Sequence, residues 1–217
     1  MSADGLEACL EKMRREGLAD AALETFRHYY ELLEQGETGL IAEDEIEPID
    51  ELPRFDDLPE SEGGDVLDRA VVIKLNGGLG TSMGMTGPKS LLEVKDGHTF
   101  LDVIARQVLE LRRRSGARVP LVLMNSFATR EPSLERLRAH EGIEADLPLD
   151  FVQNKEPKLR EEDLWPVEWP DDPALEWCPP GHGDLYTALQ TSGMLEGLLQ
   201  HGYRYAFVSN VDNLGAV

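Results

Sequence analysis

A short apolar run, Ala70-Val-Val-Ile-Lys-Leu75, leads directly into a segment that has four glycines between positions 77 and 84. Runs rich in β-branched residues are typical of strands buried in a parallel sheet. Glycines placed just after such a strand let the backbone turn tightly and let its amide groups approach a ligand. Successive free N–H groups favour an anion, and Lys89 adds a positive charge five residues beyond the last of these glycines. The pattern therefore predicts a phosphate-binding loop at the end of a buried strand.

The spacing within this loop excludes two common phosphate-binding motifs. A Walker A motif requires glycine immediately before the lysine and another glycine five residues earlier, but this chain has Pro88 and Met83 at those positions. The dinucleotide-binding fingerprint, if begun at Gly78 and Gly80, also requires glycine at position 83. We therefore expect neither a P-loop ATPase nor a dinucleotide-dependent dehydrogenase.

Strand and helix patterns alternate along the rest of the chain, which predicts an α/β fold with a mostly parallel sheet and helices on both of its faces. Strands are expected at Ala70–Leu75, Ser90–Val94, Val119–Met124, Phe151–Gln153 and Tyr205–Ser209. Helices are expected after a Thr99 cap, from Thr129 to His140, and after an Asp184 cap, where Leu185, Leu189, Met194 and Leu198 recur.

Polar residues follow three of the expected strands. The glycine-rich loop follows Leu75, Asn125-Ser126 follows Met124, and a segment from Asn210 to Asn213 follows the last strand. In open α/β sheets, ligands bind beyond the carboxyl ends of the strands. The three polar clusters are therefore expected to line one shared crevice.

The first third of the chain differs in composition, so we expect an N-terminal unit (residues 1–69) before a nucleotide-binding core (residues 70–217). Residues 1–69 hold 21 acidic and 6 basic side chains out of a net charge of -21 for the whole chain. An acidic, proline-bearing stretch from about residue 43 to residue 68 is expected to be an extended connector that lies on the core or is partly disordered. Before it, a helix is expected from the helical spacing of Leu18, Ala22, Phe26, Tyr29 and Leu33.

The strong negative charge leaves no long-range attraction for nucleic acid or an anionic membrane, so neither is expected as a partner. The chain has no apolar run long enough to cross a bilayer, and its start lacks the layout of a signal peptide. Cys9 and Cys178 lie far apart without metal-binding spacing, which indicates a reducing compartment. A cytoplasmic location is therefore expected.

Five blocks of sequence, taken together, resemble the signature of the eukaryotic-type UTP–glucose-1-phosphate uridylyltransferases. They are Lys74-Leu-Asn-Gly-Gly-Leu-Gly-Thr-Ser-Met-Gly84 with Gly87-Pro-Lys-Ser90, Met124-Asn-Ser-Phe127, Phe151-Val-Gln153 with Pro157, Pro179-Pro-Gly-His-Gly-Asp184, and Ser209-Asn-Val-Asp-Asn-Leu-Gly215. The resemblance implies a Rossmann-like nucleotidyltransferase core that joins UTP and glucose 1-phosphate and releases pyrophosphate. Members of the family are considerably longer, so we expect this chain to be a truncated, N-terminal portion of such an enzyme.

The resemblance also implies roles for individual residues. Nucleotide contacts are implied for Leu75, Asn76, Gly77, Gly78, Gly80, Thr81, Gln153 and Gly181. Lys89 would be catalytic, because it would neutralise the charge that develops at the α-phosphate. His182 and Asn210 would bind the sugar phosphate, and Asp212 would hold Mg²⁺, which typically takes one or two carboxylates together with substrate phosphates.

Plainer interpretations stay open for several of these residues. Lys89 could form a structural salt bridge, Gln153 could be a buried amide bonded to the backbone, His182 could be structural, and Asp212 could stabilise an Asx turn. The function has alternatives as well. One is a related UDP-sugar or UDP-N-acetylhexosamine pyrophosphorylase, and another is that the 217 residues alone form a non-catalytic nucleotide-binding module.

Overall fold

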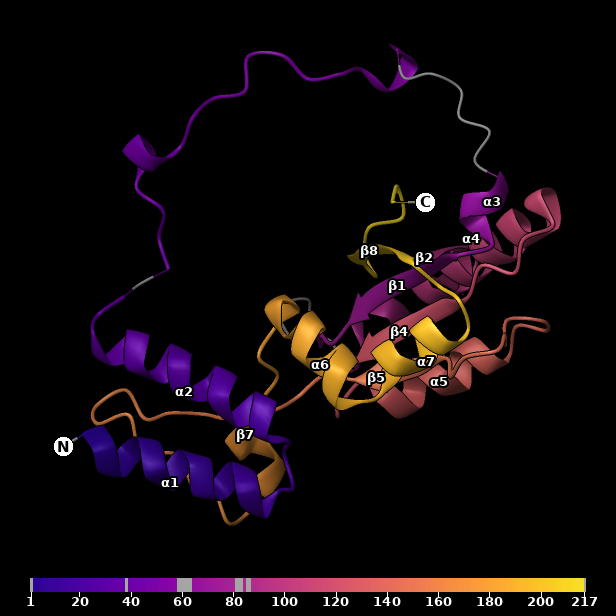
Figure 1. Ribbon diagram of the computed structural model, residues 1–217. Coiled ribbons are helices and arrows are strands. Elements are labelled where there is room, and N and C mark those ends of the chain that lie inside the picture. Colours follow the sequence, from indigo (N-terminus) through magenta and orange to yellow (C-terminus); the bar gives the residue numbers. More distant parts are fainter. Residues whose placement is uncertain (1, 38, 58–63, 81–83, 85–86, 217) are drawn as a thin grey trace.

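The computed structural model describes residues 2–37, 39–57, 64–80, 84 and 87–216. At its centre lies a parallel sheet of four strands in the order β5-β4-β1-β8 (Figure 1). These strands are β1 (Ala70–Asn76), β4 (Leu121–Asn125), β5 (Asp150–Val152) and β8 (Tyr205–Asn210). Four of the five expected strands therefore belong to this sheet, and the predicted parallel arrangement is confirmed.

Helices cover both faces of the sheet, as predicted. Successive side chains of a strand point to opposite faces, and β4 divides its side chains in this way. Leu121 and Leu123 pack with α4 (Phe100–Ser115) and α5 (Arg130–Arg138). Val122 and Met124 pack with α6 (Leu185–Thr191) and α7 (Met194–Gln200) on the opposite face. β4 thus contributes side chains to two hydrophobic cores, one on each face of the sheet.

The start of α4 confirms the predicted Thr99 cap. The Thr99 hydroxyl accepts a hydrogen bond from the Asp102 amide, and the Asp102 carboxylate accepts one from the Thr99 amide, which completes a capping box. The same carboxylate accepts hydrogen bonds from Arg136 and His140 on the α5 side. Burial would raise the pKa of Asp102, but these hydrogen bonds outweigh it and hold the pKa well below its ordinary value. Asp102 therefore joins α4 to α5.

Two expected elements take a different form. Ser90–Val94 is not a strand of the main sheet: a 3₁₀ turn spans Lys89–Leu91, and the short β2 (Glu93–Lys95) pairs in antiparallel fashion with β3 (His98–Thr99). Asp96 and Gly97 form the turn between these two strands, with φ of 52° and 76°. The single helix expected after Asp184 is two helices, because Gly193, with φ of 77°, interrupts it between α6 and α7.

Two helices, not one, form the N-terminal region. α1 (Ser2–Arg15), which the sequence analysis did not predict, packs beside α2 (Asp20–Glu34) (Figure 1). The buried side of α2 also differs from the expected stripe, because Tyr29 is 64% exposed while Tyr30 is buried. The residues that α2 buries are Ala22, Leu23, Phe26 and Tyr30.

Residues from the second half of the chain complete the core of this N-terminal pair. Trp177, in the small antiparallel pair β6 (Glu156–Pro157) and β7 (Trp177–Cys178), is buried among side chains of α1 and α2. The ammonium groups of Lys12 and Lys155 lie 5.5 and 4.5 Å from the centre of the Trp177 ring. Lys12 also pairs with Glu176. These contacts fix the two helices against the segment that leads into the candidate site.

The acidic connector does not lie on the core. Residues 39–54 are exposed throughout and run in a wide arc away from the sheet before α3 (Gly64–Leu67) leads into β1 (Figure 1). Within the described residues, no helix is both long and apolar enough to span a membrane. Cys9 and Cys178 are both free thiols, and burial raises the pKa of Cys9 to about 11.

Candidate functional site

The glycine-rich segment begins at the carboxyl end of β1 and folds back on itself. Leu79 and Pro88 form an antiparallel bridge, the Gly80 amide donates to the Gly87 carbonyl at 3.0 Å, and the Lys89 amide donates to the Gly78 carbonyl at 3.2 Å. These bonds bring Lys89 beside Gly78 although eleven positions separate them. The tip of the loop, including Thr81, lies outside the described residues. Lys89 has no salt bridge within the part of the chain that the structure describes.

The side chain of Asn76 supports this loop from inside the protein. It is fully buried, and its Nδ2 donates to Asn125 Oδ1 at 2.6 Å and to Ser133 Oγ at 2.8 Å. The Asn76 side chain thus joins the end of β1 to β4 and α5, and its contact with a nucleotide stays a prediction. Its backbone carbonyl is also engaged, since it accepts a hydrogen bond from Thr129 at 2.6 Å.

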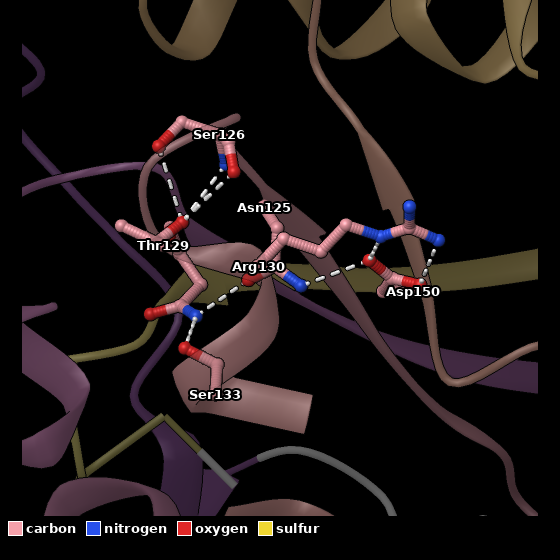
Figure 2. A network of polar contacts seen from close by, with 7 residues as sticks. Asn125, Ser126, Thr129, Arg130, Ser133 and Asp150 are labelled. Atoms are coloured by element: carbon pink, nitrogen blue, oxygen red, sulfur yellow. Dashed lines mark hydrogen bonds and ion pairs between the residues drawn. The ribbon is translucent and has the colours of Figure 1, made fainter. Parts of the chain in front are cut away.

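Figure 2 shows how this buried network continues toward β5. Asn125 Nδ2 donates to Asp150 Oδ2 at 3.1 Å, and Arg130 at the start of α5 pairs with the same carboxylate at 2.9 Å. Thr129 accepts a hydrogen bond from the Ser126 amide at 2.9 Å. Hydrogen bonds between side chains thus join the carboxyl ends of β1 and β4 to α5 and to the first residue of β5.

Gln153 follows β5 directly and lies against the start of the glycine-rich loop. Its backbone N–H donates to the Asn125 carbonyl at 2.8 Å, and the residue is 5% exposed. A Cβ atom placed on Gly77 would come within 2.0 Å of Gln153 Nε2, so only glycine permits this approach. Gln153 Oε1 is buried and has no hydrogen-bond partner among the described residues. An unpaired buried carbonyl oxygen is costly in the free protein, which points to a donor supplied from outside.

Gly181 and His182 lie in the loop that enters α6. Gly181 has φ of 98° and ψ of -165°, a conformation that is strained for any residue with a Cβ atom. A 3₁₀ turn then spans His182–Asp184, and the His182 side chain is exposed. Asp184 occupies the N-cap position of α6, as expected, but its side chain makes no capping hydrogen bond. It instead accepts hydrogen bonds from the backbone amide and the side chain of Asn154 at 2.6 and 2.8 Å.

Asn210 is the last residue of the edge strand β8, and Asp212 follows the strand. β8 pairs with β1 so that Asn210 stands opposite Leu75, and the Val211 amide donates to the Leu75 carbonyl at 3.2 Å. Asn210 and Asp212 are both exposed. The buried ammonium group of Lys74 holds the following segment, since it donates to Ser209 Oγ at 2.7 Å and to the Ala216 carbonyl at 2.8 Å.

The structure therefore brings most of the expected site residues to one edge of the sheet. Gln153 contacts Gly77, Lys89 lies beside Gly78, and Asn210 is opposite Leu75. Asp184 and Asn154 link the Gly181–His182 turn to Gln153. Sequence reasoning missed the roles of Asn154 and Asp184 and the buried position of Lys74. A lysine inside an apolar strand run was the one signal that could have indicated the last of these.

Asp212 is the one acidic residue that the sequence analysis assigned to a metal. The described residues contain no group of three or more His, Cys, Asp or Glu side chains that could hold a metal ion by themselves. A single exposed carboxylate at the carboxyl edge of the sheet fits Mg²⁺, which is usually held by one or two carboxylates together with substrate phosphates and water. The donor set at this edge thus suits an ion that arrives with a phosphate ligand.

Comparison with known proteins agrees with this arrangement. The family model described as UTP--glucose-1-phosphate uridylyltransferase matches residues 23–217. A probable UTP--glucose-1-phosphate uridylyltransferase of Schizosaccharomyces pombe is 46% identical over 171 residues, which are 77% of this chain and 34% of that protein. The UTP--glucose-1-phosphate uridylyltransferase of Solanum tuberosum is 44% identical over 173 residues, which are 79% of this chain and 36% of that protein.

Solved structures give the same result. A UDP-glucose phosphorylase from Trypanosoma brucei superposes with a TM-score of 0.90 at 46% identity, covering 98% of this chain and 46% of that one. The UDP-glucose pyrophosphorylase from Leishmania major gives a TM-score of 0.91 at 44% identity, covering 99% and 45% of the two chains. The chain spans about a third of the length of the curated relatives it matches. With its fold, its loop and its sequence in agreement, the chain belongs to the UTP–glucose-1-phosphate uridylyltransferase family.

Proposed function

We propose that the chain forms the nucleotide-binding part of an enzyme that joins UTP and glucose 1-phosphate to give UDP-glucose and pyrophosphate. The observation that carries the proposal is the Gln153 amide, which lies against Gly77 with its carbonyl oxygen buried and unpaired among the described residues. A glutamine amide offers one acceptor beside two donors. Uracil presents an N–H between two carbonyl groups, so one edge of the base can pair with both ends of the amide.

The glycine-rich loop supplies the phosphate side of this proposed site. Gly77, Gly78 and Gly80 place backbone close to the ligand without side chains, and Lys89 stands beside Gly78 because of the bridge between Leu79 and Pro88. Thr81 belongs to the same proposal and lies outside the described residues. An uncompensated lysine at this point suits the charge of a triphosphate, since no described carboxylate pairs with it.

The proposed reaction requires little acid–base catalysis by the protein. An oxygen of the sugar phosphate attacks the α-phosphorus of UTP, the bond to the β-phosphate oxygen breaks, and pyrophosphate leaves in line. The attacking phosphate is already ionised, so no general base is needed. Because both reactants are polyanions, rate enhancement has to come from positioning them and from neutralising charge. Lys89 is the group that we assign to the charge at the α-phosphate.

Mg²⁺ would be held by Asp212, with Asn210 and His182 toward the sugar phosphate. When bound, Mg²⁺ neutralises phosphate charge and orients the reacting groups. The position of Asp212 is set by this chain: β8 pairs with β1 in register, and Lys74 and Gln107 hold the Ala216 and Leu214 carbonyls of the segment that follows. Asp212 therefore lies on a loop that is fixed at both ends.

Glucose is the sugar that the comparisons support over an N-acetylhexosamine. The relatives are named for glucose 1-phosphate, and structures from Leishmania major at 44% identity hold UDP-glucose. A cytosolic location belongs to the same proposal, and the two free thiols support it.

Calorimetric titration of the 217-residue chain with UTP in the presence of Mg²⁺ tests the nucleotide site directly. We expect saturable binding of UTP that is much tighter than binding of CTP. A protein of the relatives' length that contains these residues is expected to form UDP-glucose from UTP and glucose 1-phosphate. UTP binding by the 217 residues without any turnover in the longer protein would favour the non-catalytic alternative, whereas no UTP binding by either would refute the proposal.

A further inference from the structure

Asp184 links two segments of the candidate site, the one that carries Gln153 and the turn that carries Gly181 and His182. Asn154 follows Gln153 directly, and Asp184 ends the turn that begins with Gly181 and His182. Asp184 Oδ2 accepts the backbone N–H of Asn154 at 2.6 Å, and Oδ1 accepts Asn154 Nδ2 at 2.8 Å. Both oxygens of one carboxylate are thus used on one residue, which fixes the orientation of Asn154 as well as its distance.

The surroundings make a purely structural role a poor explanation for this carboxylate. Asp184 is 6% exposed, and no described basic side chain pairs with it. Burial raises the pKa of Asp184, and the nearby Asp184 charge adds to the effect of burial on the pKa of Glu156. A buried carboxylate that has neutral donors only is a costly way to hold two loops together. Helix capping does not explain it either, because Asp184 makes no capping hydrogen bond to α6.

The bridge completes a chain of contacts around Gln153. On one side, the backbone N–H of Gln153 donates to the Asn125 carbonyl, and its side-chain Nε2 lies close to Gly77. On the other side, its neighbour Asn154 is held by Asp184. The side-chain amide of Gln153 can therefore keep one orientation relative to both the glycine-rich loop and the Gly181–His182 turn.

We propose that Asp184 is a positioning residue for uridine recognition, which fixes the Gln153 amide relative to the Gly181–His182 turn and so determines the preference for uracil over cytosine. The inference rests on the proposed function, since it takes Gln153 as the residue that meets the base. Cytosine differs from uracil by having an acceptor at N3 and donors at N4. An amide held in one orientation rejects that edge, whereas an amide that is free to turn over accepts it.

Exchanging the two side chains gives a matched test. In Asp184→Asn, the new NH₂ group faces the donors of Asn154, so one of the two hydrogen bonds is lost. In Asn154→Asp, the carboxylates of residues 154 and 184 face each other, and the hydrogen bond between the two side chains is lost. In the double exchange, Asn at position 184 can accept the backbone N–H of residue 154 and donate to the new Asp there. Both hydrogen bonds are then restored with the polarity of the side-chain pair reversed.

The experiment compares the unsubstituted chain, the two single variants and the double exchange by calorimetric titration with UTP and with CTP in Mg²⁺. Loss of a hydrogen bond to a charged group makes the competent arrangement rarer, and we expect the affinity of each single variant for UTP to fall about tenfold. The ratio of UTP to CTP affinity should fall in the single variants and return in the double exchange. Thermal unfolding of all four proteins checks that they are folded, and if a single variant is unfolded, the double exchange is compared directly with the unsubstituted chain.

The outcomes separate the two proposals. If the unsubstituted chain binds UTP and Asp184→Asn binds UTP and CTP with unchanged affinities, the role of Asp184 is refuted while the proposed function stands. The same holds if a folded double exchange binds UTP no better than the weaker single variant. If the unsubstituted chain binds no UTP, the proposed function fails and this inference fails with it.

Discussion

Replacing Gly77 with alanine should weaken nucleotide binding while the protein stays folded. The new Cβ atom would lie 2.0 Å from Gln153 Nε2, so the amide has to move by about 1.4 Å to reach an ordinary contact distance of 3.4 Å. Gly77 does not lie in the left-handed region, so alanine fits its backbone conformation. Crowding of one side-chain end costs about 1–2 kcal/mol of folding free energy. A displacement of that size takes the amide out of hydrogen-bond range of a bound uracil.

The loss in affinity can be estimated from the two hydrogen bonds that Gln153 would make. At about 1 kcal/mol for each bond, Gly77→Ala should weaken UTP binding by about 2 kcal/mol, or roughly 30-fold. Calorimetric titration measures the affinity, and urea unfolding measures the stability. Gly197→Ala in α7 is the matched control, because its Cβ atom would meet Leu147 Cδ2 at 3.7 Å, an ordinary contact. It should gain about 0.5–1 kcal/mol in stability and bind UTP normally.

The same substitution in a Gln153→Ala background tests the proposed cause. With the amide absent, the alanine at position 77 has no clash to relieve, so it should cause little further loss of UTP affinity. If Gly77→Ala weakens UTP binding just as much when Gln153 is already alanine, the clash is not the cause and the reasoning is wrong. Unchanged UTP affinity in the single variant would refute it as well.

Three further predictions concern charge. Lys89→Ala, in a protein of the relatives' length, should lower kcat about 100-fold or more with a smaller effect on KM for UTP, as measured by pyrophosphate release. Asp212→Asn should raise the Mg²⁺ concentration needed for half-maximal activity while leaving the thermal unfolding temperature unchanged. Asp102→Asn should destabilise the fold by about 2 kcal/mol in urea unfolding at about pH 7, because it loses its charge-assisted bonds to Arg136. The folded-state pKa of Asp102 is depressed. The stability that its carboxylate contributes is therefore present above the unfolded-state pKa of about 3.9 and is lost as the pH falls below that value. The Asp102→Asn variant should accordingly lose less stability than the parent between about pH 5 and pH 3.

The parts of the fold that were predictable from sequence are those in which local pattern and tertiary burial agree. The run at β1 is apolar except for Lys74, and its two faces pack into the two hydrophobic cores. Thr99 caps α4 as its spacing indicates. The unpredicted break between α6 and α7 lies at Gly193, where one residue in the left-handed region stops a helix whose apolar spacing continues through it. The spacing of apolar residues indicates which side of a helix is buried, but it does not indicate whether the helix is continuous.

The candidate site was predictable to a different degree. The carboxyl-edge rule placed the glycine-rich loop, Asn125-Ser126 and Asn210 at one side of the sheet, and the strand register bears this out. The rule could not say which polar side chains at the end of a strand are buried, as that of Asn76 is, because the alternation along a strand is lost where the strand ends. Nor could it find the Asn154–Asp184 bridge, since a contact between residues 30 positions apart has no local signal.

The charge of the protein gives this geometry its importance. With a net charge of -21, the chain as a whole repels a triphosphate, so attraction has to come from groups within about one Debye length of the phosphates, roughly 8–10 Å. Of the two lysines that flank the end of β1, Lys74 is buried and satisfied by Ser209 and the Ala216 carbonyl, and burial lowers its pKa. Lys89 and the backbone N–H groups of the loop are left for this task. The bridge from Leu79 to Pro88 therefore has a role beyond the turn, because it brings Lys89, which has no salt bridge among the described residues, beside the glycines where the proposed function places the triphosphate.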